Sequence, residues 1–374
     1  MDGNKENINL DLMRSMAVLY VVGFHLWSYF LQNHYLEKNQ IWQFRIWSIG
    51  HWGVLIFFVH TCMVLMFSLE RLESKRPDRS LYVGFLVQRT FRIFPLSIFI
   101  VLAVAIFGLP GLLADGRFAQ VHLTSGGLIA NLFLIQNLTH TPSITGPLWS
   151  LPYEMEMYLF LPAIYLLVRN VRWGSRWAVA PLLLWGGAVL LSTSIYRIDA
   201  TGMDSTSVAP GTPDFFVYAP CFLAGAVGYM LSKGRGLRLP AGLWPVLLIL
   251  VTAAYMARPS FKVGWVCCLV LGIAIPQFKE IASPVVGRIV QLIARYSYGV
   301  YLTHLLLVWV AFQAMGGLPM WGRVVVFAIT AMLVPVALYH GIEKPMILLG
   351  KRIGAGDYSM RSLTDTLRPW RKAV

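Results

Sequence analysis

Long apolar stretches recur along this chain from Leu10 to Tyr339, and few charged side chains interrupt them. Many of these stretches hold about 20 residues, which as a helix cross the roughly 30 Å hydrocarbon core of a bilayer. Hydrophobic residues make up 57% of the chain and charged residues 13%, against about 45–50% and about 25% in soluble domains. The sequence therefore predicts an all-α fold, a polytopic bundle of membrane helices, and argues against a soluble domain.

Turn-forming residues and charges divide the apolar sequence into about ten expected spans. They lie near residues 11–31, 51–68, 93–113, 147–168, 178–195, 214–232, 241–257, 262–277, 296–314 and 322–342. The apolar run from Gly127 to Leu138 has only 12 residues, which is too short to cross. We predict that it forms an interfacial or re-entrant helix.

The distribution of basic residues predicts the orientation of the spans, because cytoplasmic segments of membrane proteins carry an excess of Lys and Arg. With the N-terminus inside, the cytoplasmic segments hold 23 of the 31 Lys and Arg, the outer segments hold 7, and Arg14 lies within a span. We therefore expect both termini in the cytoplasm. We divide the chain into a transmembrane domain, residues 1–345, and a basic cytoplasmic tail, residues 346–374.

The net charge of +14 does not indicate a nucleic-acid partner. The basic residues lie in short segments between apolar runs and form no continuous basic face with interleaved aromatic residues. The cysteines also lack a functional pattern, since they show neither metal-ligand spacing nor a disulfide framework. We expect no metal, and we interpret Cys62, Cys221, Cys267 and Cys268 as small apolar fillers in or beside the spans.

Ionisable side chains inside a membrane are costly, so each is a candidate for function. Arg14 and His25 lie eleven residues apart in the first span. At about 100° and 1.5 Å per residue they share one helix face and are separated by roughly 16 Å along it. Alternatively, Arg14 extends to the interface and His25 forms a hydrogen bond with a neighbouring helix.

Two arginines precede the third span. Arg89 and Arg92 project from one helix face at the expected cytoplasmic surface, with Pro95 after them. Guanidinium groups bind phosphate bidentately, so these side chains and Arg14 can form a phosphate clamp. A plain basic flank of a membrane helix would look the same.

The fourth span contains two carboxylates, Glu154 and Glu156, roughly 10–14 Å below the expected outer face. His25 lies at a similar expected depth. A carboxylate that meets an imidazole there would form a base with its orienting partner. The alternative is that a glutamate only links helices by hydrogen bonds, and Glu156 can instead face a loop or another helix.

Three further polar residues lie in or beside the apolar runs. For His60 and His304 we favour structural hydrogen bonding between helices. Glu343 follows the last span at the expected cytoplasmic end, where it can pair with Arg89 or Arg92. Such a pair would hold the inner entrance of the bundle in shape.

Six motifs stand in one order along these spans. They are Arg14 with His25; Gly53 to Cys62; Arg89, Arg92 and Pro95; Trp149, Ser150, Leu151, Glu154 and Tyr158; Ser297, Tyr298, Gly299, Tyr301, Leu302 and His304; and Glu343, Lys344 and Pro345. Together the motifs resemble the acyltransferase 3 family of membrane O-acyltransferases, over most of the chain. The second motif departs from the family pattern, with Leu55 at its aspartate, Thr61 at its serine and Cys62 at its glycine.

The resemblance implies transfer of an acyl group, expected to be acetyl, from cytoplasmic acyl-CoA to a hydroxyl of a glycan or glycolipid at the outer face. It also implies a multi-pass protein of the bacterial inner (cytoplasmic) membrane. In this hypothesis Arg14, Arg89 and Arg92 bind the nucleotide phosphates. His25 acts as general base or as a transient acyl carrier, and Glu154 orients it.

Two other classes of protein stay open as alternatives. A secondary transporter of a sugar or lipid precursor also buries such residues, but it predicts inverted repeats and interrupted spans in corresponding halves, and the sequence shows neither. A non-catalytic membrane scaffold or sensor that binds a lipid or acyl-CoA is the second alternative. It predicts no hydrolysis or transfer with any acceptor.

Overall fold

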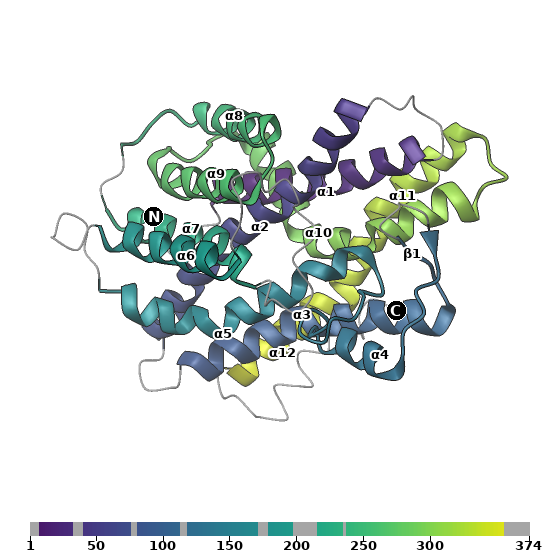
Figure 1. The fold of residues 1–374 in the computed structure, drawn as a ribbon, viewed down its shortest axis with the longest axis horizontal. Helices are drawn as coiled ribbons and strands as arrows, with labels where there is room; N and C mark the ends of the chain where they lie inside the picture. The colour runs from purple at the N-terminus through teal and green to yellow at the C-terminus, as the bar shows by residue number, and fades with distance from the viewer. Residues whose placement is uncertain are drawn as a thin grey trace. The chain divides into compact units, whose positions relative to one another are not determined.

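The computed structural model describes residues 7–32, 40–75, 81–112, 118–170, 179–196, 215–234 and 237–354. Most of these residues are helical, as the sequence predicts (Figure 1). The described strands are a pair of two-residue segments, β1 (Gly111–Leu112) and β2 (Phe118–Ala119), which run antiparallel. The helical fold class is therefore confirmed.

Each expected span overlaps one helix. In chain order these helices are α1 (Ile8–Gln32), α2 (Gln40–Lys75), α3 (Leu81–Phe107), α5 (Leu151–Val168), α6 (Ala180–Tyr196), α7 (Phe215–Ser232), α8 (Leu243–Ala257), α9 (Phe261–Ala274), α10 (Pro284–Trp309) and α11 (Met320–Leu338). Two shorter α-helices, α4 (Ser125–Leu132) and α12 (Lys344–Gly354), complete the described set. Short 3-10 segments, η1 (Gly146–Ser150) and η2 (Ile275–Gln277), and π-helical turns, η3 (Val310–Ala314) and η4 (Tyr339–Glu343), adjoin the α-helices.

Within the described residues, seven helices are long and apolar enough to cross a membrane. Three shorter apolar helices, Leu182–Ser194, Leu243–Ala257 and Phe261–Gln277, coincide with the other three expected spans. The protein is therefore a multi-pass membrane protein. The count of ten crossings and the cytoplasmic placement of both termini stay predictions.

Several helices extend beyond the apolar runs that predicted them. The third begins at Leu81 rather than near residue 93, so Arg89 and Arg92 lie inside α3, and it continues without a break past Pro95 to Phe107. The second is longer at both ends, from Gln40 to Lys75. Charged residues end an apolar run but not a helix, because Arg, Lys and Glu are good helix formers.

The short run from Gly127 to Leu138 is helical only in its first half. Helix α4 ends at Leu132, and turns follow it. The buried Asn131 side chain holds this segment closed: it donates to the Pro142 carbonyl at 3.0 Å and accepts from the Ile144 N–H at 2.9 Å. The short helix is confirmed, and its interfacial or re-entrant position stays a prediction.

The described chain forms two compact units. Unit 1 contains the residues up to Arg71 and from Tyr153 to Ser297, and unit 2 contains Leu72 to Pro152 and the residues from Tyr298 onward. The division passes through helices α2, α5 and α10. Within unit 1, α7 and α9 pack side by side (Figure 1), and the Trp265 indole of α9 donates to the Val217 carbonyl of α7 at 2.7 Å.

Helices α1 and α2 also meet inside unit 1. A Cβ on Gly53 would lie 2.6 Å from the Ala17 carbonyl oxygen and 2.9 Å from a Val21 methyl group. Only glycine, which has no Cβ, permits so close an approach of the α2 backbone to α1. The crossing therefore places Gly53, the first residue of the second motif, against the helix that carries Arg14 and His25.

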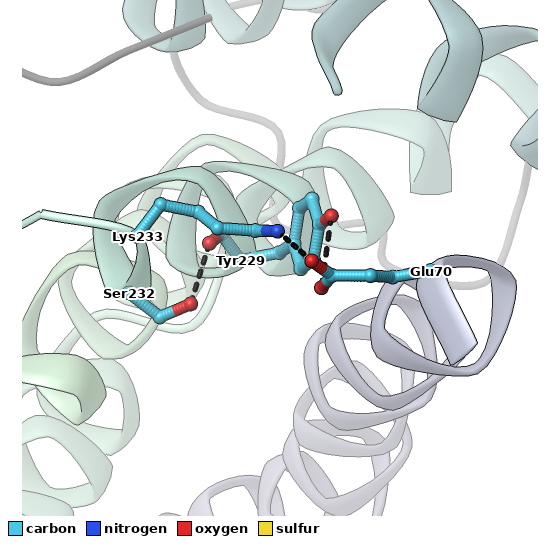
Figure 2. Close-up of polar contacts among 4 residues, drawn as sticks. All are labelled: Glu70, Tyr229, Ser232 and Lys233. Atoms are coloured by element: carbon cyan, nitrogen blue, oxygen red, sulfur yellow. Dashed lines mark hydrogen bonds and ion pairs between the residues drawn. The ribbon is translucent and has the colours of Figure 1, made fainter. Parts of the chain in front are cut away.

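An ion pair joins Glu70, near the end of α2, to Lys233, which directly follows α7 (Figure 2). The Glu70 carboxylate binds the Lys233 ammonium group and accepts from the Tyr229 hydroxyl at 3.2 Å. The ammonium group also lies 4.8 Å from the centroid of the Tyr229 ring. The pair is partly exposed, and exposed pairs contribute about 0–1 kcal/mol, so it adjusts the packing of these helices rather than determining it.

Within unit 2, α12 packs along α3. Tyr298, the second residue of the fifth motif, donates its hydroxyl to the Ile93 carbonyl of α3 at 2.8 Å. The expected domain boundary after residue 345 falls inside α12, and the remainder of the expected tail, residues 355–374, lies outside the described residues. The division into domain and tail stays a prediction.

Candidate functional site

The His25 ring contacts the backbone of its own helix, α1, through one of its two nitrogens. Its Nδ1 lies 2.9 Å from the Val21 carbonyl oxygen, one turn earlier in the helix. A carbonyl oxygen only accepts, so Nδ1 carries the hydrogen in this contact and Nε2 of the neutral ring holds the lone pair. The side chain is half-buried. In this tautomer Nε2 is the basic and nucleophilic nitrogen of His25.

Arg14 contacts the fifth motif. Its Nε donates to the Ser297 hydroxyl at 2.6 Å, and that hydroxyl donates to the Ala294 carbonyl at 2.8 Å. Both residues belong to unit 1. Because α1 is one continuous helix, the expected separation of roughly 16 Å along its axis between Arg14 and His25 applies to this structure.

Glu154 lies in the first turn of α5, directly after η1. The buried Tyr158 hydroxyl donates to its Oε1 at 2.7 Å. A carboxylate accepts several hydrogen bonds, so this contact leaves capacity for a second donor. Glu156 is half-buried on the same helix. The expected pairing of Glu154 with His25 stays a prediction.

Arg89 and Arg92 lie on α3 in unit 2, whereas Arg14 lies in unit 1. Both α3 arginines are half-buried, and the Arg89 guanidinium carbon lies 5.7 Å from the centroid of the Phe85 ring. Their three-residue spacing on a regular helix places them on one face, as expected. The joint phosphate clamp with Arg14 stays a prediction.

Ser150 and the fifth motif meet inside unit 2. The buried Ser150 hydroxyl and the Tyr301 hydroxyl are 2.7 Å apart. One turn further along α10, His304 is 1% exposed, and its Nδ1 lies 2.7 Å from the Tyr301 carbonyl oxygen and 3.2 Å from that of Val300. These described contacts of the His304 ring nitrogen are with its own helix.

His60 and Glu343 are buried, with exposed fractions of 3% and 1%. Glu343 ends the π-helical turn η4, and a Cβ on Gly299 would lie 3.4 Å from its Oε1. The glycine of the fifth motif therefore leaves room for the glutamate of the last motif. The expected pairing of Glu343 with Arg89 or Arg92 stays a prediction.

The four cysteines are buried and reduced. Among the described residues, no group of three or more His, Cys, Asp or Glu side chains is arranged to hold a metal ion. The expectation that the protein uses no metal stays a prediction.

A polar network around the middle of α1 was not expected from the sequence. In unit 1 the Thr252 hydroxyl contacts Tyr20 of α1 and Trp52 of α2, and the Tyr255 hydroxyl lies 2.9 Å from His51 Nδ1. A signal was present, because Trp244, Thr252 and Tyr255 recur on one face of α8 at helical spacing. A lone hydroxyl in an apolar helix, however, does not indicate its partner.

The family model described as an acyltransferase domain, that of acyltransferase 3, matches residues 7–340. A relative from Streptomyces mycarofaciens, "Acyltransferase MdmB", is 24% identical over 340 residues, which cover 81% of this chain and 82% of that protein. No solved structure matches the chain. On the extent of the family match, the chain belongs to the acyltransferase 3 family and is an acyltransferase.

Proposed function

We propose that the protein is an integral membrane O-acyltransferase of the bacterial inner membrane. It moves an acyl group, expected to be acetyl, from cytoplasmic acyl-CoA to a hydroxyl of a glycan or glycolipid at the outer face. The observation that carries this proposal is α1 itself, a single helix with a guanidinium group near its start and a half-buried imidazole roughly 16 Å further along.

The acyl-CoA donor is proposed to lie along α1, between Arg14 and His25. Arg14, Arg89 and Arg92 bind the phosphates of CoA through charge-assisted hydrogen bonds. The pantetheine arm then brings the thioester towards His25, because an extended chain of that kind spans a distance comparable to the rise between Arg14 and His25. The acyl group is thereby delivered to the end of α1 opposite to the nucleotide.

His25 acts at its Nε2 in either of two routes. As general base, Nε2 takes the proton of the acceptor hydroxyl while that oxygen attacks the thioester carbonyl; the C–S bond breaks, and CoA leaves as a thiolate that takes up a proton. As carrier, Nε2 itself attacks the thioester carbonyl, the C–S bond breaks, and CoA leaves as a thiolate that takes up a proton. In a second step the acceptor hydroxyl attacks the acyl group, loses its proton and releases the His25 imidazole. Glu154 is proposed to orient the imidazole in both routes.

The test is the His25→Ala variant, purified beside the wild-type protein. Radiolabelled acetyl-CoA serves as donor, and the total lipid and glycan extract of cells that lack the gene serves as acceptor mixture. We expect label in ester linkage with the wild-type protein and none with His25→Ala, at equal expression and equal thermal stability. A folded variant with normal turnover would exclude this role of His25.

The acceptor is identified by mass spectrometry of surface glycans and lipids from cells with and without the gene. A missing acetyl or longer acyl ester defines the acyl group and the acceptor class together. If the wild-type protein releases CoA but leaves both classes of molecule unmodified, the proposed acceptor class is wrong.

A further inference from the structure

Helix α8 packs in unit 1 through a stripe of buried residues, and every polar side chain on that stripe contacts α1 or α2. The buried residues are Trp244, Leu248, Val251, Thr252 and Tyr255. The Trp244 indole donates to the Asn9 carbonyl at 3.0 Å, near the start of α1. The Tyr255 ring stacks on Trp52 of α2, with centroids 4.8 Å apart. A stripe that served only apolar packing would not need these polar groups.

The Thr252 hydroxyl uses its whole hydrogen-bonding capacity. It donates its hydrogen to the Leu248 carbonyl at 2.8 Å, so its lone pairs accept from the other two partners. The Trp52 indole N–H donates to it at 2.9 Å, and the Tyr20 hydroxyl lies at 3.3 Å. One hydroxyl of α8 therefore joins α1 and α2 at the same point.

This point lies between the two ionisable residues of α1. Tyr20 follows Arg14 by six residues and precedes His25 by five, which is about 7.5 Å along the axis. Without a directional contact, a helix that packs by apolar surface can rotate or slide by small amounts. The contact between Tyr20 and Thr252 therefore adds a directional restraint on the rotation and depth of α1, about 7.5 Å from His25.

We propose that Thr252 is a positioning residue for acyl transfer. Through Tyr20 and Trp52 it holds α1 against α2, and so sets the direction in which His25 presents its Nε2. This inference rests on the proposed function, because it requires His25 to be the reacting group. Displacing a catalytic group by about 1 Å costs up to about 100-fold in rate, so a small shift of α1 is enough to matter.

The experiment compares four variants with the labelled acetyl-CoA assay and the same extract as acceptor mixture. Thr252→Val keeps the shape of the side chain and removes the hydroxyl. Thr252→Ser restores the hydroxyl. Tyr20→Phe removes only the bond to α1 and leaves the bond between Thr252 and Trp52 in place. For each variant the apparent kcat, the KM for acetyl-CoA and the thermal midpoint are measured.

Ser192→Ala is the matched structural control. The Ser192 hydroxyl is also fully buried and also joins two helices of unit 1, because it lies on α6 and donates to the Phe216 carbonyl of α7 at 2.6 Å. It contacts neither α1 nor α2 in the described bonds. We expect loss of the Ser192 hydroxyl to lower the thermal midpoint, as loss of the Thr252 hydroxyl does, but to leave His25 in position.

We expect Thr252→Val to lower kcat by about 10- to 100-fold with little change in the KM for acetyl-CoA. Thr252→Ser should restore kcat to within about threefold of the wild type, and Tyr20→Phe should lower it by about three- to tenfold without a change in thermal midpoint. Ser192→Ala should keep the wild-type kcat. This pattern separates positioning from general stability.

Wild-type kcat in folded Thr252→Val and Tyr20→Phe overturns the inference, and so does an equal fall of kcat in Ser192→Ala. If Thr252→Val does not fold, Tyr20→Phe decides alone. Failure of the proposed function has a different signature, because a folded His25→Ala variant then keeps normal turnover whatever the α8 variants do.

Discussion

His25 and His304 are two histidines in apolar helices with the same local bond and different surroundings. Each places Nδ1 against a carbonyl oxygen of its own helix, at 2.9 Å from Val21 and 2.7 Å from Tyr301. His304 is enclosed, with 1% of its surface exposed, whereas His25 is half-buried. A substrate needs accessible surface on the imidazole that it meets, so we expect burial, rather than the hydrogen bond, to separate a reacting His25 from a structural His304.

The largest expected effect tests this comparison directly. His25→Gln should lower kcat by at least about 100-fold, because general acid–base catalysis contributes typically 10²- to 10⁴-fold. His304→Gln should keep kcat within about threefold and lower the thermal midpoint instead, because it perturbs a packed site. Both are measured with radiolabelled acetyl-CoA and by thermal unfolding in detergent. An inactive but fully stable His304→Gln would place His304 among the reacting groups.

The second prediction turns from the histidines to the arginines that are proposed to bind the CoA phosphates. Arg89→Gln and Arg92→Gln should each raise the KM for acetyl-CoA by about tenfold or more, because each removes a charge-assisted hydrogen bond to phosphate, worth about 1.5–3 kcal/mol. The value of kcat should change less. Arg288→Gln, an exposed arginine of α10, is the control and should keep the wild-type KM. Unchanged donor affinity in both α3 variants would contradict the phosphate-binding role.

A third, smaller effect concerns the carboxylate that we propose orients His25. Glu154→Gln should lower kcat by about tenfold, because a neutral amide stabilises the imidazolium less than a carboxylate does. Glu156→Gln, two residues along the same helix, should have little effect on kcat. Steady-state kinetics of the two variants give the answer. The reverse result would assign the orienting role to Glu156.

The smallest expected effect lies in the enclosed region around His304. Ser150→Ala removes the 2.7 Å contact with Tyr301 and should lower the free energy of unfolding by about 1–3 kcal/mol, because a buried hydroxyl loses its partner. Tyr301→Phe should lower the free energy of unfolding by a similar amount. The double variant should lower it by less than the sum of the two single effects, because both remove the same contact. All three should keep kcat, which is measured beside the thermal midpoint. A large fall in kcat at normal stability would mean that this contact takes part in transfer.

Helix positions were predictable because a bilayer requires long uncharged segments, and the sequence shows them plainly. The ends of the helices were not predictable in this way. Helix α3, for example, begins at Leu81 and continues through two arginines that interrupt its apolar run. The π-helical turn at Tyr339–Glu343 was also not expected. Such turns depend on the packing of neighbouring helices, and no composition signal marks them.

The candidate site was predictable in part for a related reason. Arg14, His25 and Glu154 are conspicuous because ionisable groups are rare in apolar helices. Thr252 is not conspicuous, because threonine in a membrane helix usually bonds the carbonyl one turn earlier and needs no other partner. Thr252 does form that bond, and its two further contacts come from helices more than 190 residues away in sequence. Only the fold shows them.

The bond between His25 Nδ1 and the Val21 carbonyl also bears on the lifetime of an acylated histidine. Attack by Nε2 on a thioester gives an acylimidazolium cation, and this cation becomes the more durable neutral acylimidazole only when Nδ1 loses its hydrogen. A carbonyl oxygen inside a helix binds that hydrogen and does not remove it as a base. An acyl group on His25 would therefore stay activated and pass on quickly, which predicts that such a species is trapped only by rapid quenching.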